Sequence, residues 1–146
     1  EEDGYTHDAE VVIYTGPDEE FQGREIMFGY NTRGNTLTIV DMTDHENPEI
    51  IGQQTYEGAS YTHQGWLTED MTHLFLDDEA DERRGGIGEN TRTMTWDVSD
   101  LRNPTLVFEF FSEETVIDHN QCVLAGDTYI IFRFFHSGPV LGLLKL

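Results

Sequence analysis

Three histidines stand at equal intervals along the chain. His7, His63 and His119 are each separated by 56 positions, a spacing typical of internal duplication. The same offset relates other pairs, which include Tyr5 and Tyr61, Asp41 and Asp97, Asn47 and Asn103, and Pro48 and Pro104. We therefore expect repeated structural units: two whole ones and part of a third.

Each unit reads as a set of short strands. Thr36–Asp41 alternates apolar and polar residues, and Thr91–Asp97 occupies the matching place in the second unit. We predict an all-β fold without capped amphipathic helices, in which each unit is a four-stranded antiparallel blade of a β-propeller. The blades span about 7–56 and about 63–111, with a partial third at about 119–146. A β-sandwich is the structural alternative.

A propeller closes with about four to eight blades, so the predicted blades form a partial ring. We expect either that the chain is a fragment of a longer protein or that other chains complete the ring. Two turns, Asp41–Asp44 and Asp97–Asp100, should hold the chain between the third and fourth strands of each unit. Their short Asp, Ser and Thr side chains suit hydrogen bonds to nearby backbone amides.

Several segments resemble the choice-of-anchor B family, which is built from LVIVP-type repeats. The resemblance extends over nearly the whole chain and rests on Tyr5–Asp8, Gly23–Ile26, Thr36–Asp41, Tyr61–Asp70, Leu76–Glu79 and 118–120. It implies a β-propeller in a secreted or surface-anchored protein. It implies no particular reaction, and it assigns no catalytic residue.

The chain is strongly acidic, with 29 acidic against 8 basic residues and a formal net charge of −21. This charge argues against a basic face for nucleic acid or anionic membranes and favours cations as ligands. The alternative is that the charge only solvates the surface. No apolar run approaches the roughly 18 residues of a membrane-spanning helix, so we expect no membrane insertion. We predict an extracellular or cell-surface location and a protein or extracellular polymer as partner.

In a propeller, the first strand of each blade lines the central channel. The repeated histidines should therefore gather near one mouth of that channel, where imidazoles suit Zn or Cu. The predicted metal ligands are His7, His63 and His119, and the residues following them, Asp8, Gln64 and Asn120, would orient the rings. The alternative is a structural role, in which each histidine bonds a neighbouring blade.

A second candidate cation site is an acidic segment of the second unit, expected on the same face as the histidines. Its carboxylates, which suit Ca²⁺, belong to Asp77, Asp78, Glu79, Asp81 and Glu82. The alternative interpretation is a solvated loop that Arg83 and Arg84 partly neutralise.

No nucleophile elbow, phosphate-binding loop or zinc-protease helix is present, so the sequence assigns no catalytic residue. The function we expect is a binding or structural interaction module with a divalent cation at the histidine-lined mouth. Two alternatives stay open: a metal-dependent extracellular hydrolase or lyase, and a subunit of a larger assembly.

Overall fold

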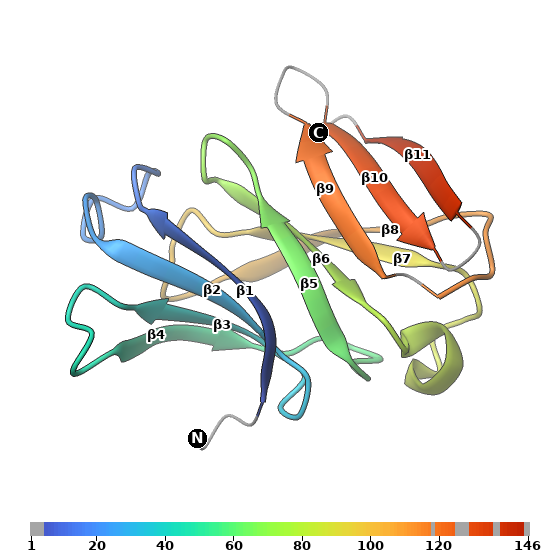
Figure 1. The fold of residues 1–146 in the computed structure, drawn as a ribbon, viewed down its shortest axis with the longest axis horizontal. Helices are drawn as coiled ribbons and strands as arrows, with labels where there is room; N and C mark the ends of the chain where they lie inside the picture. The colour runs from blue at the N-terminus through green and yellow to red at the C-terminus, as the bar shows by residue number, and fades with distance from the viewer. Residues whose placement is uncertain (1–4, 118, 125–128, 136–137, 145–146) are drawn as a thin grey trace.

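The fold in the computed structural model is all-β (Figure 1), and the structure describes residues 5–117, 119–124, 129–135 and 138–144. Its strands form three separate antiparallel sheets, which we call sheets I, II and III. Sheet I contains β1 (Thr6–Ile13), β2 (Glu25–Asn31), β3 (Thr36–Asp41) and β4 (Glu49–Gln54), paired in chain order.

Sheet II repeats this plan with β5 (Thr62–Leu67), β6 (His73–Asp78), β7 (Arg92–Asp97) and β8 (Thr105–Phe111). A short helical turn, η1 (Asp81–Gly85), follows β6. Sheet III consists of β9 (Asn120–Leu124), β10 (Tyr129–Phe135) and β11 (Gly138–Leu144). The prediction of four-stranded antiparallel units is thus confirmed for the first two units. Parts of the predicted third unit, at 125–128, 136–137 and 145–146, lie outside the described residues.

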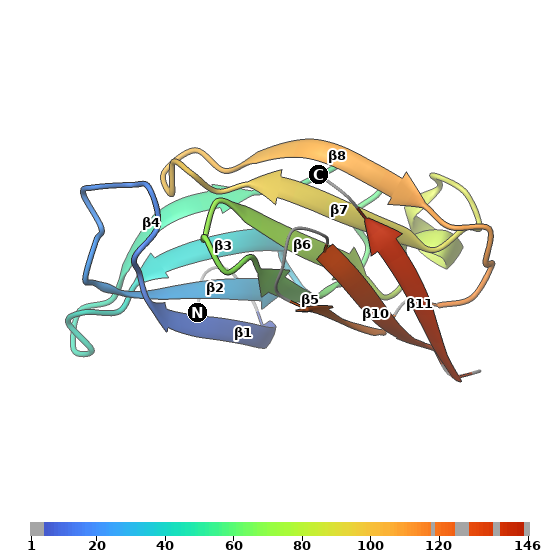
Figure 2. The ribbon, with the colours of Figure 1, turned by 90° about the horizontal axis from the view of Figure 1, so that it is seen from above.

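The three sheets follow one another in space as they do in sequence. β1 lies against β5, and β5 lies against β9, so the first strands of the sheets are neighbours (Figure 1). Sheet II therefore separates sheet I from sheet III (Figure 2). The first strands β1, β5 and β9 are therefore consecutive neighbours in space.

The main hydrophobic core fills the space between sheets I and II. Sheet I supplies a face with Ile26, Phe28 and Ile39, and sheet II supplies one that includes Leu74 and Trp96. All five side chains are buried. Burial on this scale contributes about 1.5–3 kcal/mol for each large apolar side chain, so the two sheets stabilise each other.

The 56-residue repeat is also visible in the irregularities of the strands. β1 has a bulge between Thr6 and Asp8, and β5 has one between Thr62 and Gln64. A second pair of register shifts lies at Ile39/Val40 and at Thr95/Trp96. Because each pair is related by the same 56-residue offset, equivalent register shifts occur at matching places in sheets I and II.

The predicted turns are confirmed. Asp41 accepts a hydrogen bond from the backbone N–H of Thr43 at 2.9 Å, and Asp97 accepts the equivalent bond from Ser99 at 2.9 Å. Each aspartate thereby ends a third strand and fixes the start of the following turn. In the described part of the chain, no helix has the length and apolar character needed to cross a membrane.

Candidate functional site

The three repeated histidines form a row across the first strands of the sheets. The ring centroids of His7 and His63 are 4.5 Å apart, and those of His63 and His119 are 5.0 Å apart. His63 is the central ring and is 4% exposed, whereas His7 is exposed and His119 is half-buried. The expectation that the repeat would gather its histidines therefore matches their positions in the structure.

The bulges explain how β1 and β5 direct their histidines to this row. His7 and His63 are the extra residues at the register shifts of these strands. A bulged residue is released from the strict alternation of the strand, so its side chain can be aimed differently from those of its neighbours. The fold thus uses the same local distortion twice to present an imidazole.

A buried carboxylate fixes the start of β5 beside the bulge. Asp78 accepts hydrogen bonds from the backbone N–H groups of Ser60 at 2.7 Å and Tyr61 at 2.8 Å. It also accepts one from the hydroxyl of Tyr56 at 2.8 Å. These hydrogen bonds hold the chain where it enters β5, and so they help to fix the position of His63 in that strand.

Two further carboxylates lie on opposite sides of the His63 ring. Asp77 Oδ1 is 3.6 Å from His63 Nδ1, and Glu79 Oε2 is 3.8 Å from His63 Nε2. The backbone N–H of Glu79 donates to Tyr61 O at 3.0 Å, which anchors Glu79 to the strand entry. Asp77 therefore faces the Nδ1 side of the His63 ring, and Glu79 faces the Nε2 side.

His63, Glu79 and His119 form the metal-type cluster found among the described residues. One ligand atom from each lies within 4.8 Å of those of the other two. Ligands of a tetrahedral zinc ion, bound at about 2.0–2.1 Å, are separated by roughly 3.3 Å. The cluster therefore has the composition of a His₂-carboxylate site, and its side chains would have to move closer together to bind a zinc ion.

His7 contributes to the rim of the cluster rather than to its centre. Its Nδ1 lies 3.5 Å from the hydroxyl of Tyr61, and its ring meets the Tyr61 ring edge-on at 5.4 Å between centroids. Tyr5 also contacts His7 edge-on. The repeat offset of Tyr5 and Tyr61 was the sequence signal for these aromatic neighbours, although it did not reveal their contact with His7.

The residues predicted to orient the imidazoles are Asp8, Gln64 and Asn120, and the structure gives them different surroundings from those expected. Asp8 accepts a hydrogen bond from its own neighbour, the backbone N–H of Ala9, at 2.8 Å. Gln64 joins two sheets, because its Oε1 accepts a bond from the backbone N–H of Gln121 at 2.9 Å. Asn120 is exposed at the start of β9. The carboxylate that faces the His63 ring on its Nδ1 side is Asp77.

The five acidic residues of the second unit do not share one environment. Asp77 and Asp78 are consecutive residues of β6, so their side chains leave opposite faces of the strand. Asp81 pairs with Arg92, with 2.7 Å between Asp81 Oδ2 and Arg92 Nε. Glu79 alone of the five joins the histidines in the metal-type cluster.

The interpretation of this segment as a solvated loop is wrong for three of its residues. Asp77 and Asp78 are 0% exposed, and Asp81 is 1% exposed. Each is buried because it satisfies polar groups of the fold: Asp77 accepts from Gln64 N, Asp78 from the entry to β5, and Asp81 from Arg92. Sequence composition alone could not separate these structural carboxylates from a surface run.

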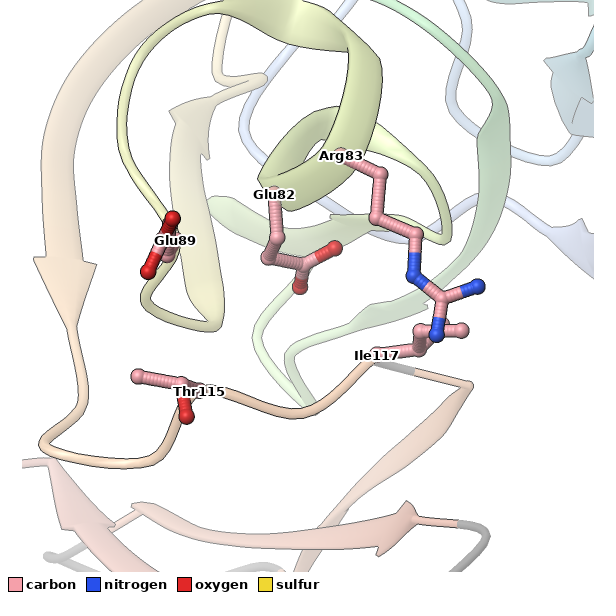
Figure 3. Close-up of a pocket in the computed structure, with 5 residues that line it drawn as sticks. All are labelled: Glu82, Arg83, Glu89, Thr115 and Ile117. Atoms are coloured by element: carbon pink, nitrogen blue, oxygen red, sulfur yellow. The ribbon is translucent and has the colours of Figure 1, made fainter.

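A pocket of about 360 Å³ opens beside η1. Figure 3 shows Glu82 and Arg83 from this turn opposite Thr115 and Ile117 of the connection that follows β8, with Glu89 at the side. Two carboxylates and one guanidinium make the lining polar. The pocket is separate from the histidine row, since none of the three histidines lines it.

The acidic groups around the row create a negative local environment. Burial, together with Glu10, Asp8 and Asp77, raises the pKa of Tyr30 well above its usual value. Those carboxylates therefore lie close enough to act on a buried group between sheets I and II. A cation approaching His63 would be attracted by the same charges.

No protein-family model matches the chain, and no curated protein matches it.

Proposed function

We propose that the chain forms part of a β-propeller of the type found in LVIVP-repeat proteins. Three observations support this arrangement: the four-stranded sheets I and II, the succession β1, β5, β9, and the bulges shared by equivalent first strands. In such a ring the first strands line the central channel. The histidine row then lies at one mouth of the channel, and each sheet is one blade.

The function we propose is cation-dependent binding at this mouth, in a secreted or cell-surface interaction module. The observation that carries the proposal is the convergence of His63, His119 and Glu79, whose ligand atoms lie within 4.8 Å of one another. Repeat-related histidines supply two of the three groups. Their partner would be a protein or an extracellular polymer that reaches the metal at the channel mouth.

The ligand chemistry favours a transition metal such as zinc over calcium. Two imidazole nitrogens and one carboxylate suit Zn²⁺, Ni²⁺, Cu²⁺ or Fe²⁺, whereas Ca²⁺ takes six to eight oxygen ligands. The acidic residues that would have formed an all-oxygen site are instead dispersed, as Asp78 and Asp81 show. The acidic segment therefore does not favour a calcium site. Glu79 instead becomes a candidate ligand beside the two histidines.

Asp77 would increase the metal affinity of this site through its contact with the Nδ1 side of His63. A carboxylate that faces the second nitrogen of a metal-binding histidine selects the tautomer and raises the basicity of the ligating nitrogen. Asp77 lies 3.6 Å from His63 Nδ1, on the side of the ring away from Glu79. Metal binding would draw the carboxylate and the ring into a direct hydrogen bond.

Isothermal titration calorimetry of metal-free protein with Zn²⁺ tests the proposal. We expect one tight site per chain in the wild type and a loss of affinity of at least ~100-fold in His63→Ala. His45→Ala is the matched control, because His45 is exposed and pairs with Glu25 outside the row. Equal binding by wild type and His63→Ala, or a loss of the same size in His45→Ala, would reject the site.

A metal-dependent hydrolase or lyase is the second candidate function. Its support is the number of ligands: three protein groups on zinc leave a fourth position for water, as in catalytic zinc sites. The exposed His7 ring has its centroid 4.5 Å from that of the His63 ring and would offer a base. Zinc-dependent cleavage of an extracellular polysaccharide or an ester, abolished in His63→Ala, would favour this candidate over a binding module.

A further inference from the structure

The pocket beside η1 is lined by charges of both signs. Its volume of about 360 Å³ lies within the range of roughly 300–1,000 Å³ that is usual for small-molecule sites. Two carboxylates, from Glu82 and Glu89, and one guanidinium, from Arg83, line it together with Thr115 and Ile117. In the view of Figure 3 the Glu82 carboxylate lies between Glu89 and the Arg83 guanidinium. The pocket therefore offers partners for both negative and positive groups of a ligand.

A buried ion pair holds the wall of the pocket that carries Glu82 and Arg83. Asp81, the first residue of η1, is buried and accepts a hydrogen bond from Arg92 Nε at 2.7 Å. The backbone N–H of Arg83 donates to Ala80 O at 3.1 Å, which closes the turn. Because Asp81 ties η1 to β7, the two residues that follow it extend into the pocket from a fixed backbone.

Thr91 joins the other two walls, which are the segment that carries Glu89 and the connection that follows β8. The Thr91 side chain is buried, and its hydroxyl donates to Val116 O at 2.6 Å. Its backbone N–H donates to Glu114 O at 3.0 Å, and its carbonyl accepts from the backbone N–H of Ser112 at 2.9 Å. These hydrogen bonds fasten the two walls to each other. The lining is therefore largely in place before a ligand binds, which lowers the cost of binding.

The charges of the lining restrict the class of ligand. Two carboxylates and one guanidinium leave a net lining charge of −1, and the chain as a whole carries −21, so a simple anion is repelled. A divalent metal ion would be attracted by the carboxylates but repelled by Arg83. A small molecule with two cationic groups and one carboxylate gives each of the three charged side chains a partner of opposite sign.

We propose that this pocket binds a free amino acid with a basic side chain, of the type of arginine or lysine. Arg83 pairs with the α-carboxylate of the ligand, while Glu82 and Glu89 hold its α-ammonium group and its side-chain cation. Ile117 supplies apolar surface for the aliphatic stem of the ligand. The site is independent of the proposed metal site, because its lining residues are distinct from the histidine row.

Two-dimensional proton–nitrogen NMR of the labelled chain, titrated with L-arginine in the presence of EDTA, tests the proposal. We expect saturable shifts of the backbone amides of η1 and of residues 112–117. Three related compounds each lack one of the recognised charges: agmatine lacks the carboxylate, Nα-acetyl-L-arginine the α-ammonium group, and glycine the side-chain cation. Each should bind at least ~tenfold more weakly than L-arginine, the usual effect of losing one hydrogen bond between charged groups.

Substitutions in the lining provide the second part of the test. Arg83→Gln and Glu89→Gln should each weaken the binding of L-arginine at least ~tenfold, and both should fold, because the two side chains are exposed. Arg84→Gln and Glu113→Gln are the matched controls, since these exposed side chains lie on the same walls but outside the lining. Their affinity for L-arginine should stay that of the wild type.

Binding that falls in both lining variants and persists in both controls supports the proposal. A wild-type chain without saturable shifts overturns it, as does a control variant that loses as much affinity as Arg83→Gln. Agmatine, Nα-acetyl-L-arginine or glycine binding as tightly as L-arginine overturns the assignment to basic amino acids. His63→Ala should bind L-arginine like the wild type, so failure of the zinc titration and failure of the arginine titration are separate results.

Discussion

Asp77 and His63 are neighbours across the first two strands of sheet II, with Asp77 Oδ1 3.6 Å from His63 Nδ1. Both side chains are almost fully buried, and the carboxylate also accepts a hydrogen bond from the backbone N–H of Gln64 at 2.9 Å. The aspartate is therefore held by the backbone while it faces the ring. This relationship gives the histidine row a fixed member around which the more exposed His7 and His119 are arranged.

Asp77→Asn should weaken zinc binding by about 10- to 100-fold, the usual effect of losing a carboxylate behind a ligating histidine. The amide keeps the size of the side chain and can still accept the bond from Gln64, so the fold should survive. Calorimetry measures the change. Asp8→Asn is the control, because Asp8 is exposed and accepts a hydrogen bond from the adjacent Ala9. Unchanged affinity in Asp77→Asn would show that Asp77 serves the backbone alone.

Gly65→Ala should destabilise the packing of sheet II on sheet I by about 1–3 kcal/mol, the range found for overpacked cores. A Cβ at Gly65 would lie 2.5 Å from Tyr30 Cε1 and 2.7 Å from the carbonyl oxygen of Phe75. Gly29→Ala is the matched control within sheet I, where the nearest atoms would be at 3.5 Å. Urea denaturation of both variants gives the comparison, and equal midpoints would contradict the close approach of β5 to Tyr30.

Most of the fold could be predicted from the sequence, because the same strand and turn patterns occur at two places separated by 56 residues. Thr36–Asp41 was predicted with the same bounds that β3 has in the structure, and the predicted Thr91–Asp97 begins one residue before β7. The turns at Asp41 and Asp97 followed from side-chain chemistry that acts over two residues. Local patterns of this kind are readable because strand alternation and turn bonds depend on neighbours in the chain.

The candidate site was predictable only in part. The spacing of His7, His63 and His119 indicated a common location, since equivalent positions of a repeat occupy equivalent places. Glu79 was grouped with its acidic neighbours instead, because nothing in the chain marks which carboxylate turns toward a histidine 16 residues earlier. The burial of Asp78 and Asp81 depends on Tyr56 and Arg92, partners that are distant in sequence.

Arg92→Ala should lower the free energy of unfolding by about 3–5 kcal/mol, because it leaves the buried carboxylate of Asp81 without its arginine partner. Arg92 is 1% exposed, and it donates to Asp81 at 2.7 Å and to Glu109 at 2.8 Å. Chemical denaturation measures the loss. Arg102→Ala is the contrasting control, because its pair with Glu20 is exposed to solvent and should contribute little to stability. Similar losses in the two variants would contradict the distinction.

Acid should destabilise the protein partly through Asp97. The hydrogen bond from the backbone N–H of Ser99 lowers the pKa of Asp97 below its usual 3.8. A depressed pKa in the folded state contributes stability that is present above about pH 4 and lost as the pH falls through the folded value. Asp97→Asn should therefore be less stable than wild type at pH 6, with the gap narrowing toward pH 2. Urea midpoints across this range test it, and a gap that is constant with pH would refute it.

The central claim is that His63, His119 and Glu79 bind one transition-metal ion. Zinc K-edge X-ray absorption of protein loaded with one equivalent of Zn²⁺ tests it most directly, because imidazole ligands give a characteristic outer-shell scattering pattern. We expect a first shell of nitrogen and oxygen atoms at about 2.0–2.1 Å with two imidazoles, and one imidazole fewer in His119→Ala. An all-oxygen shell, or a spectrum that His119→Ala leaves unchanged, would contradict it.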